Sequence, residues 1–179
     1  IAADITERKQ AEAETLRHLA ELQALYENGL AVGRLLSPRE IGERVIQTFT
    51  HYLSWHHVAI RVRKGESDDL ELVAFSAPHM LGETQEDVEQ NFTARINKVG
   101  QSMSGWMVQT GEPIRTGKVQ DFPQYVDTYE AIQSGMYMPL KVGDQVIGSI
   151  SVESELPDAF TQQDERLLAT LASQAAVAF

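Results

Sequence analysis

Cysteine is absent from the 179-residue sequence. Its absence excludes disulfides, cysteine-ligated zinc, thiol catalysis and thioether attachment of a chromophore within these residues. A chain without cysteine fits a reducing compartment, and we expect a cytoplasmic location, although every compartment tolerates such a chain. The sequence begins at Ile1 and ends at Phe179 inside an apolar helical pattern, so we expect it to be a piece of a longer polypeptide.

Long apolar runs and basic charge are also scarce. No run approaches the roughly 18 apolar residues of a membrane-spanning helix, so we expect no membrane span in this piece. The chain carries 15 Lys and Arg residues against 26 Asp and Glu residues, which gives a net charge of −11. Such an acidic surface repels phosphate backbones, so nucleic acid is not an expected partner.

The sequence shows no set of residues that predicts an enzyme or a metal site. It has no phosphate-binding glycine loop and no nucleophile–histidine–acid combination, so we predict no catalytic residues. His56 and His57 are adjacent and would point to opposite faces of a strand. The other three histidines have no second ligand at helical spacing. We therefore predict no metal site, and only a single haem-ligating histidine is left open.

The first half of the chain predicts two helices and a pair of strands. Leucines three and four residues apart predict a long helix over residues 1–36, whose apolar stripe needs a partner: this domain's sheet or a second chain. Ser37 and Pro38 predict the N-cap and first position of a second helix. Alternating apolar residues then predict antiparallel strands at 58–63, half-buried, and at 70–75. Residues 83–95 predict an acidic helix.

The second half predicts a short helix, a hairpin and a last helix. Gly111 and Pro113 separate the helix from an extended run and an aromatic-rich loop at 119–125. Residues 136–142 and 146–152 alternate around a Gly143-Asp144 turn, the strongest hairpin signal in the chain. Thr161 predicts the N-cap of the last helix. The order predicts an α+β fold: an antiparallel sheet of five to six strands, N- and C-terminal helices on one face, and a pocket on the other.

Aromatic, methionine and serine side chains near the second half are candidates for lining that pocket. Apolar area of adaptable shape with a few polar groups is typical of small-molecule sites. The alternative is plain core, which fits Trp106 and Met138 best. Ser104 and Gly105 are expected to open the short helix, as an ordinary cap or as an anion site. The candidate pocket residues are Phe75, Trp106, Phe122, Tyr125, Tyr129, Met136, Met138, Ser149 and Ser151.

Several short motifs follow in a fixed order from residue 105 to the end. They are Gly105-Trp106 with Thr110-Gly111-Glu112-Pro113, Val119-Gln120-Asp121, Tyr125, Pro139-Leu140 with Gly148, and Phe160-Thr161-Gln162-Gln163-Asp164-Glu165 before the last apolar helix. Together they resemble the GAF domain, the small-molecule sensor module of signalling proteins, over roughly residues 24–179. Residues 4–12 resemble the tail of a PAS domain, so residues 1–23 are expected to be a PAS tail and linker helix.

The resemblance also implies tests that this chain fails. Cyclic-nucleotide-binding members carry Asn-Lys shortly before Phe-x-x-x-Asp-Glu, whereas Asn97-Lys98 lies far upstream of Phe160. Phytochrome-like members attach a bilin through cysteine, and members that reduce methionine sulfoxide use catalytic cysteine. The absence of cysteine excludes a covalent bilin and that reductase chemistry, and the cofactor stays unknown.

These observations predict a non-catalytic sensory domain of a larger protein, with a sensor histidine kinase of a two-component system as the expected parent. A small molecule or the upstream PAS domain would shift the packing of the first and last helices across a homodimer and so bias a downstream output domain. One alternative is a ligand-free structural relay that only dimerises. The other is a regulatory domain of a diguanylate cyclase or phosphodiesterase.

Overall fold

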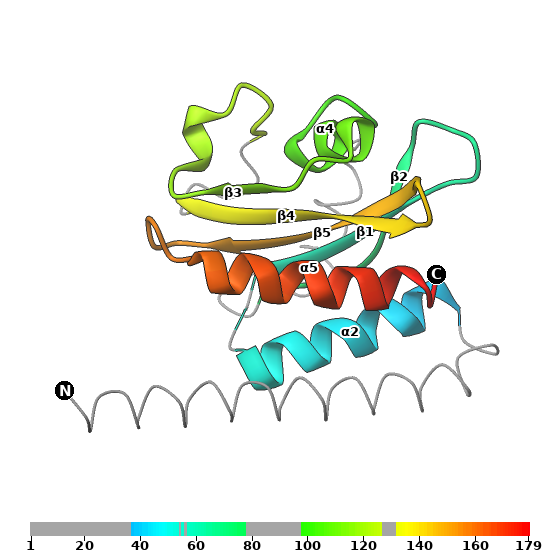
Figure 1. The fold of residues 1–179 in the computed structure, drawn as a ribbon, viewed down its shortest axis with the longest axis horizontal. Coiled ribbons are helices and arrows are strands. Elements are labelled where there is room, and N and C mark those ends of the chain that lie inside the picture. The colour runs from blue at the N-terminus through cyan, green and yellow to red at the C-terminus, as the bar shows by residue number, and fades with distance from the viewer. Residues whose placement is uncertain (1–36, 54, 56, 78–97, 127–131) are drawn as a thin grey trace. The chain divides into compact units, whose positions relative to one another are not determined.

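The computed structural model describes residues 37–53, 55, 57–77, 98–126 and 132–179 (Figure 1). The long N-terminal helix expected at 1–36, the acidic helix expected at 83–95 and the candidate residue Tyr129 lie outside the described residues.

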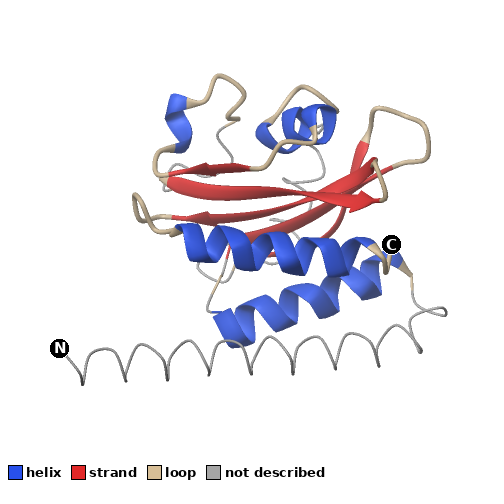
Figure 2. Ribbon diagram, in the orientation of Figure 1, coloured by secondary structure: helices blue, strands red, loops and turns tan. Residues whose placement is uncertain are grey.

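Five antiparallel strands form one sheet in the order β2-β1-β5-β4-β3. The elements in chain order are α2 (Pro38–Leu53), β1 (His57–Arg63), β2 (Leu70–Ser76), α4 (Met103–Thr110), β3 (Ile114–Thr116), the 3-10 helix η1 (Val119–Asp121), β4 (Ser134–Val142), β5 (Gln145–Ser154) and α5 (Gln162–Ala176). Helices α2 and α5 cover one side of the sheet, and α4 and η1 lie over the other (Figures 1 and 2). The α+β fold with a five-stranded antiparallel sheet is therefore confirmed.

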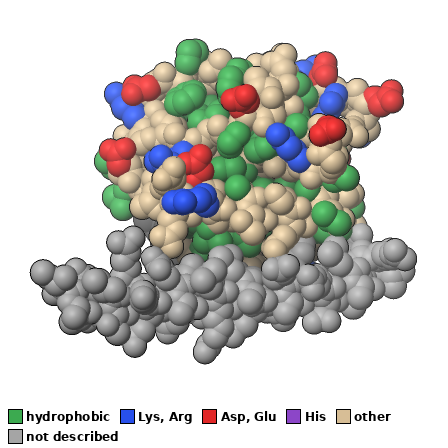
Figure 3. Space-filling model, viewed as in Figure 1, with side chains coloured by type: hydrophobic (Ala, Val, Ile, Leu, Met, Phe, Trp, Pro, Cys, Tyr) green, Lys and Arg blue, Asp and Glu red, His purple; other side chains and the backbone are tan. Residues whose placement is uncertain are grey.

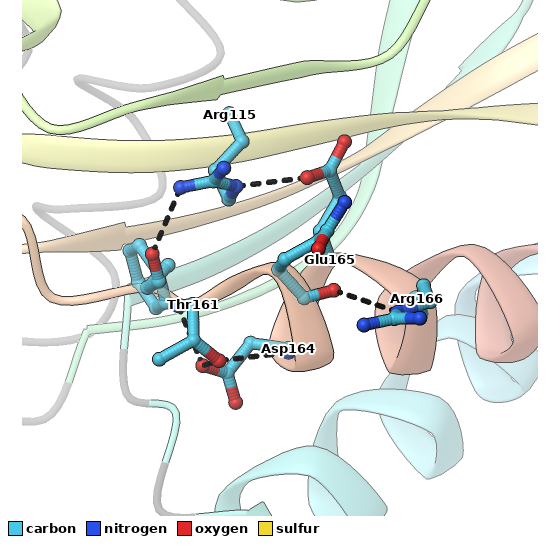
Figure 4. A network of polar contacts seen from close by, with 7 residues as sticks. Arg115, Thr161, Asp164, Glu165 and Arg166 are labelled. Atoms are coloured by element: carbon cyan, nitrogen blue, oxygen red, sulfur yellow. Dashed lines mark hydrogen bonds and ion pairs between the residues drawn. The ribbon is translucent and has the colours of Figure 1, made fainter.

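Side-chain caps fix where the two long helices begin. Ser37 and Glu40 bond reciprocally at the start of α2, with Ser37 N donating to Glu40 Oε2 at 2.7 Å and Glu40 N to Ser37 Oγ at 3.3 Å. Thr161 and Asp164 form the same capping box at α5, where Asp164 N donates to Thr161 Oγ1 at 3.2 Å (Figure 4). Each box satisfies two main-chain N–H donors that the helix itself leaves free, and both predicted caps are confirmed.

Helix α4 begins earlier than the sequence suggested. Ser102 is its N-cap and accepts a hydrogen bond from Gly105 N at 3.0 Å, so the expectation that Ser104 opens the helix is wrong. Ser104 is buried inside the first turn instead. At the other end, Gly111 adopts φ 70° and its N–H donates to Met107 O at 2.7 Å, which confirms the predicted glycine turn.

A glycine lets α4 lie directly against the segment that precedes it. A Cβ on Gly105 would overlap the Lys98 carbonyl oxygen and stand 3.1 Å from the Gly100 nitrogen. Both neighbours are main-chain atoms, which cannot move aside as the tip of a flexible side chain can. Glycine is therefore required where the two backbones approach each other, which explains why the Gly105-Trp106 motif begins with glycine.

The side of the sheet under α2 and α5, here called the α5 face, is an apolar core. Phe49 of α2 is 1% exposed and meets the Trp55 ring edge-on at a centroid distance of 5.8 Å. From the strands and from α5, the fully buried apolar residues include Val58, Ile60, Met136, Met138, Leu140, Ile150, Val152 and Leu168. Burial of these side chains is the main force that holds the helices to the sheet.

Candidate functional site

The opposite side of the sheet, here called the α4 face, is identified by the pairing of β3 with β4. Ile114 lies opposite Tyr137, and both pack with Met107 of α4. The next residue, Arg115, lies opposite Met136 and bonds to α5. Because directly opposed residues point to the same side of a sheet, odd-numbered residues of β4 in this stretch face α4 and even-numbered ones face α5.

Continuous pairing extends this assignment across the central strands. Tyr137 opposes Ser151, and Ser151 opposes Ala59. Polar side chains accumulate along these positions of the α4 face, and we name them the polar floor: His57, Arg61, Tyr137, Ser149, Ser151 and Glu153. On the same strands, the residues that alternate with them are the apolar core of the α5 face. The middle of the neighbouring strands β1 and β5 is therefore polar on the α4 face and apolar on the α5 face, and both sides are buried there.

Four members of the polar floor are shut off from solvent. Arg61 is 5% exposed, Tyr137 2%, Ser149 0% and Ser151 4%. The hydroxyl of Ser151 lies 3.4 Å from the carbonyl oxygen of Ala59. Within the described part of the chain, the buried Ser149 hydroxyl has no hydrogen-bond partner. Leaving a hydroxyl buried without a partner costs about 1–3 kcal/mol, so this position is unusual for a purely structural residue.

A tyrosine–glutamate pair lies at one end of the polar floor. The Tyr137 hydroxyl donates to Glu153 Oε1 at 2.6 Å. Burial raises the pKa of the partly buried Glu153 carboxyl above its ordinary value of 4.5, and the Tyr137 hydrogen bond and the Arg61 charge offset part of that rise. Burial, followed by the Glu153 charge, raises the pKa of Tyr137 well above 10.0. Tyr137 is therefore a neutral hydrogen-bond donor at physiological pH.

The pKa of Glu153 predicts how stability depends on pH. Between its ordinary pKa and its raised value, the folded protein holds a proton that the unfolded chain releases, so this group's contribution to the free energy of unfolding falls as pH rises. Glu153→Gln removes that dependence and keeps an acceptor for Tyr137. Urea unfolding at a pH below 4.5 and at neutral pH gives the free energy of unfolding of both proteins. We expect the stability of the variant, relative to that of the wild type, to be higher at neutral pH than at the lower pH. A difference between the two proteins that does not change with pH would contradict this assignment.

An apolar and aromatic wall stands beside the polar floor. Its buried cluster comes from α4, β3, η1, β4 and the segment before β4: Met103, Met107, Ile114, Val119, Ile132 and Tyr137. Trp106, Phe122 and Tyr125 are partly buried and pack against this cluster. Tyr125 is also close enough to Tyr137 to raise its pKa slightly through its charge. The floor and the wall thus meet at Tyr137, and the α4 face combines apolar area with a few polar groups.

The structure brings six of the nine candidate residues to this face. Ser149 and Ser151 belong to the floor, and Trp106, Phe122 and Tyr125 belong to the wall. Half-buried Phe75 of β2 opposes Ala59 and lies on the same face. Tyr129 lies outside the described residues. Whether these residues bind a ligand stays a prediction.

Met136 and Met138 do not join the others, which corrects their place in the candidate set. A regular hairpin around Gly143-Asp144 would set Met138 opposite Ser149. Instead, a bulge after Leu140 shifts the register by one residue, so Met138 opposes Ile150 and Met136 opposes Val152. A shift of one residue moves every side chain beyond it to the other face. Both methionines, 0% and 2% exposed, therefore belong to the core under α5.

The sequence interpretation missed Arg61, Tyr137 and Glu153. It took the strand at 58–63 as half-buried, with Arg61 on the exposed side, whereas Arg61 is buried. The available signal was the alternation Ser149, Ser151, Glu153 against Ile150 and Val152 in the hairpin. That pattern equally describes a strand with one side in water. Only the burial of Ser149 and Ser151, and the packing of α4 against β5, show that this polar side is covered.

Comparison with known proteins agrees with this architecture. Residues 36–179 match the family model of the GAF domain. The chain belongs to the GAF domain family. No curated protein sequence matches it significantly.

Solved structures show the same fold at low sequence identity. The GAF domain of a phosphoenolpyruvate-protein phosphotransferase from Coxiella burnetii superposes with a TM-score of 0.70 at 13% identity, covering 90% of this chain and 92% of that one. A free methionine-R-sulfoxide reductase from Neisseria meningitidis, in complex with its substrate, has a TM-score of 0.66 at 21% identity, covering 87% of this chain and 89% of that one. The type II free methionine-R-sulfoxide reductase from Thermoplasma acidophilum superposes with a TM-score of 0.62 at 21% identity, covering 79% of this chain and 94% of that one. The GAF domain of a phosphotransferase and two free methionine-R-sulfoxide reductases thus share this fold.

Other kinds of site find no support among the described residues. There, no three His, Asp or Glu side chains gather as a metal site. His57 lies on the α4 face with Nε2 3.4 Å from Glu155 Oε1, which is an ordinary pairing for a histidine at a strand end. None of the described helices is long and apolar enough to cross a membrane. On the side of the described part shown in Figure 3, acidic and basic side chains are interspersed.

Proposed function

We propose that this GAF domain is a non-catalytic sensory module that binds a small molecule on its α4 face. One observation carries this: the middle of β1 and β5 is apolar toward α5 but carries Arg61, Ser149 and Ser151 toward α4, although both sides are buried there. Burying polar groups costs free energy that a plain core avoids. A buried polar floor beside an aromatic wall is the combination that orients a small ligand.

The edge strand β3 offers a route from the α4 face to α5. Its residue Ile114 packs in the wall, while the adjacent Arg115 reaches the other side of the sheet. There, Arg115 Nε donates to Glu165 Oε2 at 2.8 Å and Nη1 donates to Phe160 O at 3.2 Å (Figure 4). A ligand that displaces the wall would therefore move an anchor of the first turn of α5. This is coupling through one contiguous set of contacts.

The wider setting extends this role. We place the domain in a larger cytoplasmic signalling protein, between an upstream PAS domain and a downstream output such as a histidine kinase. The helices at both ends would pair with those of a second copy, and ligand binding would shift the population of two helix arrangements. The resemblance of residues 4–12 to a PAS tail and the apolar stripe of residues 1–36 support this arrangement.

A ligand-free relay is the second candidate. Trp106, Phe122 and Tyr125 already pack against the buried cluster, which is what a filled core requires. An enzymatic role has support only from the fold, since the structural neighbours include free methionine-R-sulfoxide reductases. Reduction by a thiol would need cysteine, and the sequence contains none.

Native mass spectrometry of the undenatured protein separates these candidates. A sensory domain is expected to show a dimer and either a co-purified small molecule or mass shifts when a small-molecule extract is added. The variant Ser151→Leu, which fills part of the polar floor, should lose the bound mass while keeping the dimer. A dimer that never binds a small molecule under any of these conditions would favour the relay.

Loss of Arg115 tests the coupling route. In Arg115→Met we expect faster hydrogen exchange of the amides in the first turn of α5, because both anchoring bonds disappear. Since Arg115 is 37% exposed, the stability lost should be only about 1 kcal/mol. Arg166→Met is the matched control, because Arg166 bonds within α5, to Gln162 O at 3.3 Å, and to no other part of the described chain. If the amides in the first turn of α5 exchange at the same rate in both variants, β3 does not couple the α4 face to α5.

A further inference from the structure

The arrangement of donors on the polar floor defines what kind of ligand it fits. Arg61 and Ser149 lie directly opposite each other on β1 and β5, and both face α4. Side chains of directly opposed residues start about 5 Å apart, so a guanidinium and a hydroxyl from such a pair can bind the same group. Both residues are buried, at 5% and 0% exposure. The Ser149 hydroxyl has no partner in the described part of the chain.

We propose that the ligand of the α4 face carries a carboxylate, which Arg61 and Ser149 bind together, and an apolar or aromatic body that packs against Trp106 and Phe122. This inference rests on the proposed sensory function and specifies its ligand. The guanidinium matches a carboxylate in shape and charge, and its five N–H donors can serve such an anion alongside other partners. The hydroxyl supplies the additional donor.

Charge on this face also favours an anion over a cation. The acidic member of the polar floor is Glu153, which the Tyr137 hydroxyl already engages at 2.6 Å. Burial raises the pKa of Glu153 and so disfavours a second negative charge beside the Tyr137 hydroxyl, whereas the guanidinium of Arg61 stays charged. A ligand carboxylate would meet Arg61 where water does not compete, and the attraction there exceeds that at a surface.

Matched acids and amides test this inference on the whole chain. The probes are benzoate and benzamide, hexanoate and hexanamide, and succinate and succinamide, with benzylamine and phenylalanine as cationic and zwitterionic comparisons. We expect one or more acids to raise the melting temperature in a concentration-dependent way, while the corresponding amides and benzylamine do not. Calorimetry then gives the dissociation constants of the acids that bind.

Three variants assign the binding to the proposed donors. Arg61→Met should weaken acid binding about 10- to 100-fold, as expected for a lost charge-assisted hydrogen bond. Ser149→Ala should weaken it less, by roughly 3- to 10-fold, as for a neutral donor. Arg61→Lys keeps the positive charge but lacks the paired N–H donors of the guanidinium, so its affinity for acids should fall between those of the wild type and Arg61→Met. This variant also tests the assignment if Arg61→Met does not fold. Arg39→Met, on the exposed surface of α2, should bind as the wild type does.

The outcomes separate this inference from the proposed function. Amides or benzylamine that bind as well as the acids, or acid binding that Arg61→Lys and Ser149→Ala leave unchanged, would overturn the carboxylate assignment and leave the sensory role standing. The same holds if a co-purified molecule has no acidic group. If neither the probes nor a small-molecule extract bind, the sensory role itself fails.

Discussion

Replacing Gly148 by alanine is expected to cost about 3 kcal/mol or more of folding free energy, because the new methyl group has no space in the centre of the sheet. Gly148 of β5 lies opposite Val62 of β1, where the two strands approach closely. A Cβ at this position would overlap the Arg61 carbonyl oxygen and stand 3.0 Å from Val62 Cα. Both are main-chain atoms of the neighbouring strand, so the two strands would have to separate.

The matched control for Gly148→Ala is Gly143→Ala in the hairpin turn. Gly143 has φ 60°, and a methyl group added there would meet no atom within 4 Å, so only the left-handed backbone is penalised, by roughly 1–2 kcal/mol. Urea unfolding of both variants gives the comparison. Separation of β1 from β5 should also weaken acid binding, since Arg61 and Ser149 lie at this junction. Equal stability losses in the two variants would show that the sheet tolerates the methyl group.

Truncation of Leu168 is expected to have the second large effect, a loss of about 2–5 kcal/mol. Leu168 is 0% exposed and lies on the side of α5 that packs on β4. Leu168→Ala removes apolar contacts and leaves a cavity between α5 and the sheet. Because the polar floor is on the other side of the sheet, ligand affinity should be nearly unchanged wherever the variant is folded.

Leu156→Ala provides the same chemical change without burial. Leu156 is 68% exposed, and its hydrogen bonds, from Ser134 Oγ and to Ser154 Oγ, use main-chain atoms that alanine retains. A change of no more than about 0.5 kcal/mol is expected there. Thermal or urea unfolding of the two variants is sufficient. A loss in Leu156→Ala that equals the loss in Leu168→Ala would mean that α5 is not held by its buried face.

Local signals in the sequence predicted the elements and the fold. Ser37 and Thr161 mark helix starts because their hydroxyls accept main-chain hydrogen bonds that nearby residues supply. The turn at Gly143-Asp144 needs the left-handed backbone that glycine adopts easily, so the hairpin was visible as well. These features depend on residues within a few positions of one another, which is the range that a single sequence displays.

The composition of the site depended on features that the sequence does not display locally. The bulge after Leu140 decides whether Met138 or Pro139 shares a face with Ser149. The residues near Leu140 contain no sequence signal that predicts this bulge. Arg61 lies opposite Ser149 on the covered α4 face because β1 pairs with β5, which is distant in the chain. Register and strand order therefore separated the candidate residues that reach the α4 face from the two that do not.

Methyl NMR of the methionines tests the central claim most directly, because these residues report on both sides of the sheet. Met103 and Met107 of α4 are part of the wall on the α4 face, whereas Met136 and Met138 lie in the core under α5. On addition of the small-molecule fraction of a cell extract, a ligand on the α4 face should move the signals of Met103 and Met107 most. Signals that all stay in place, or larger shifts at Met136 and Met138, would contradict a binding site on the α4 face.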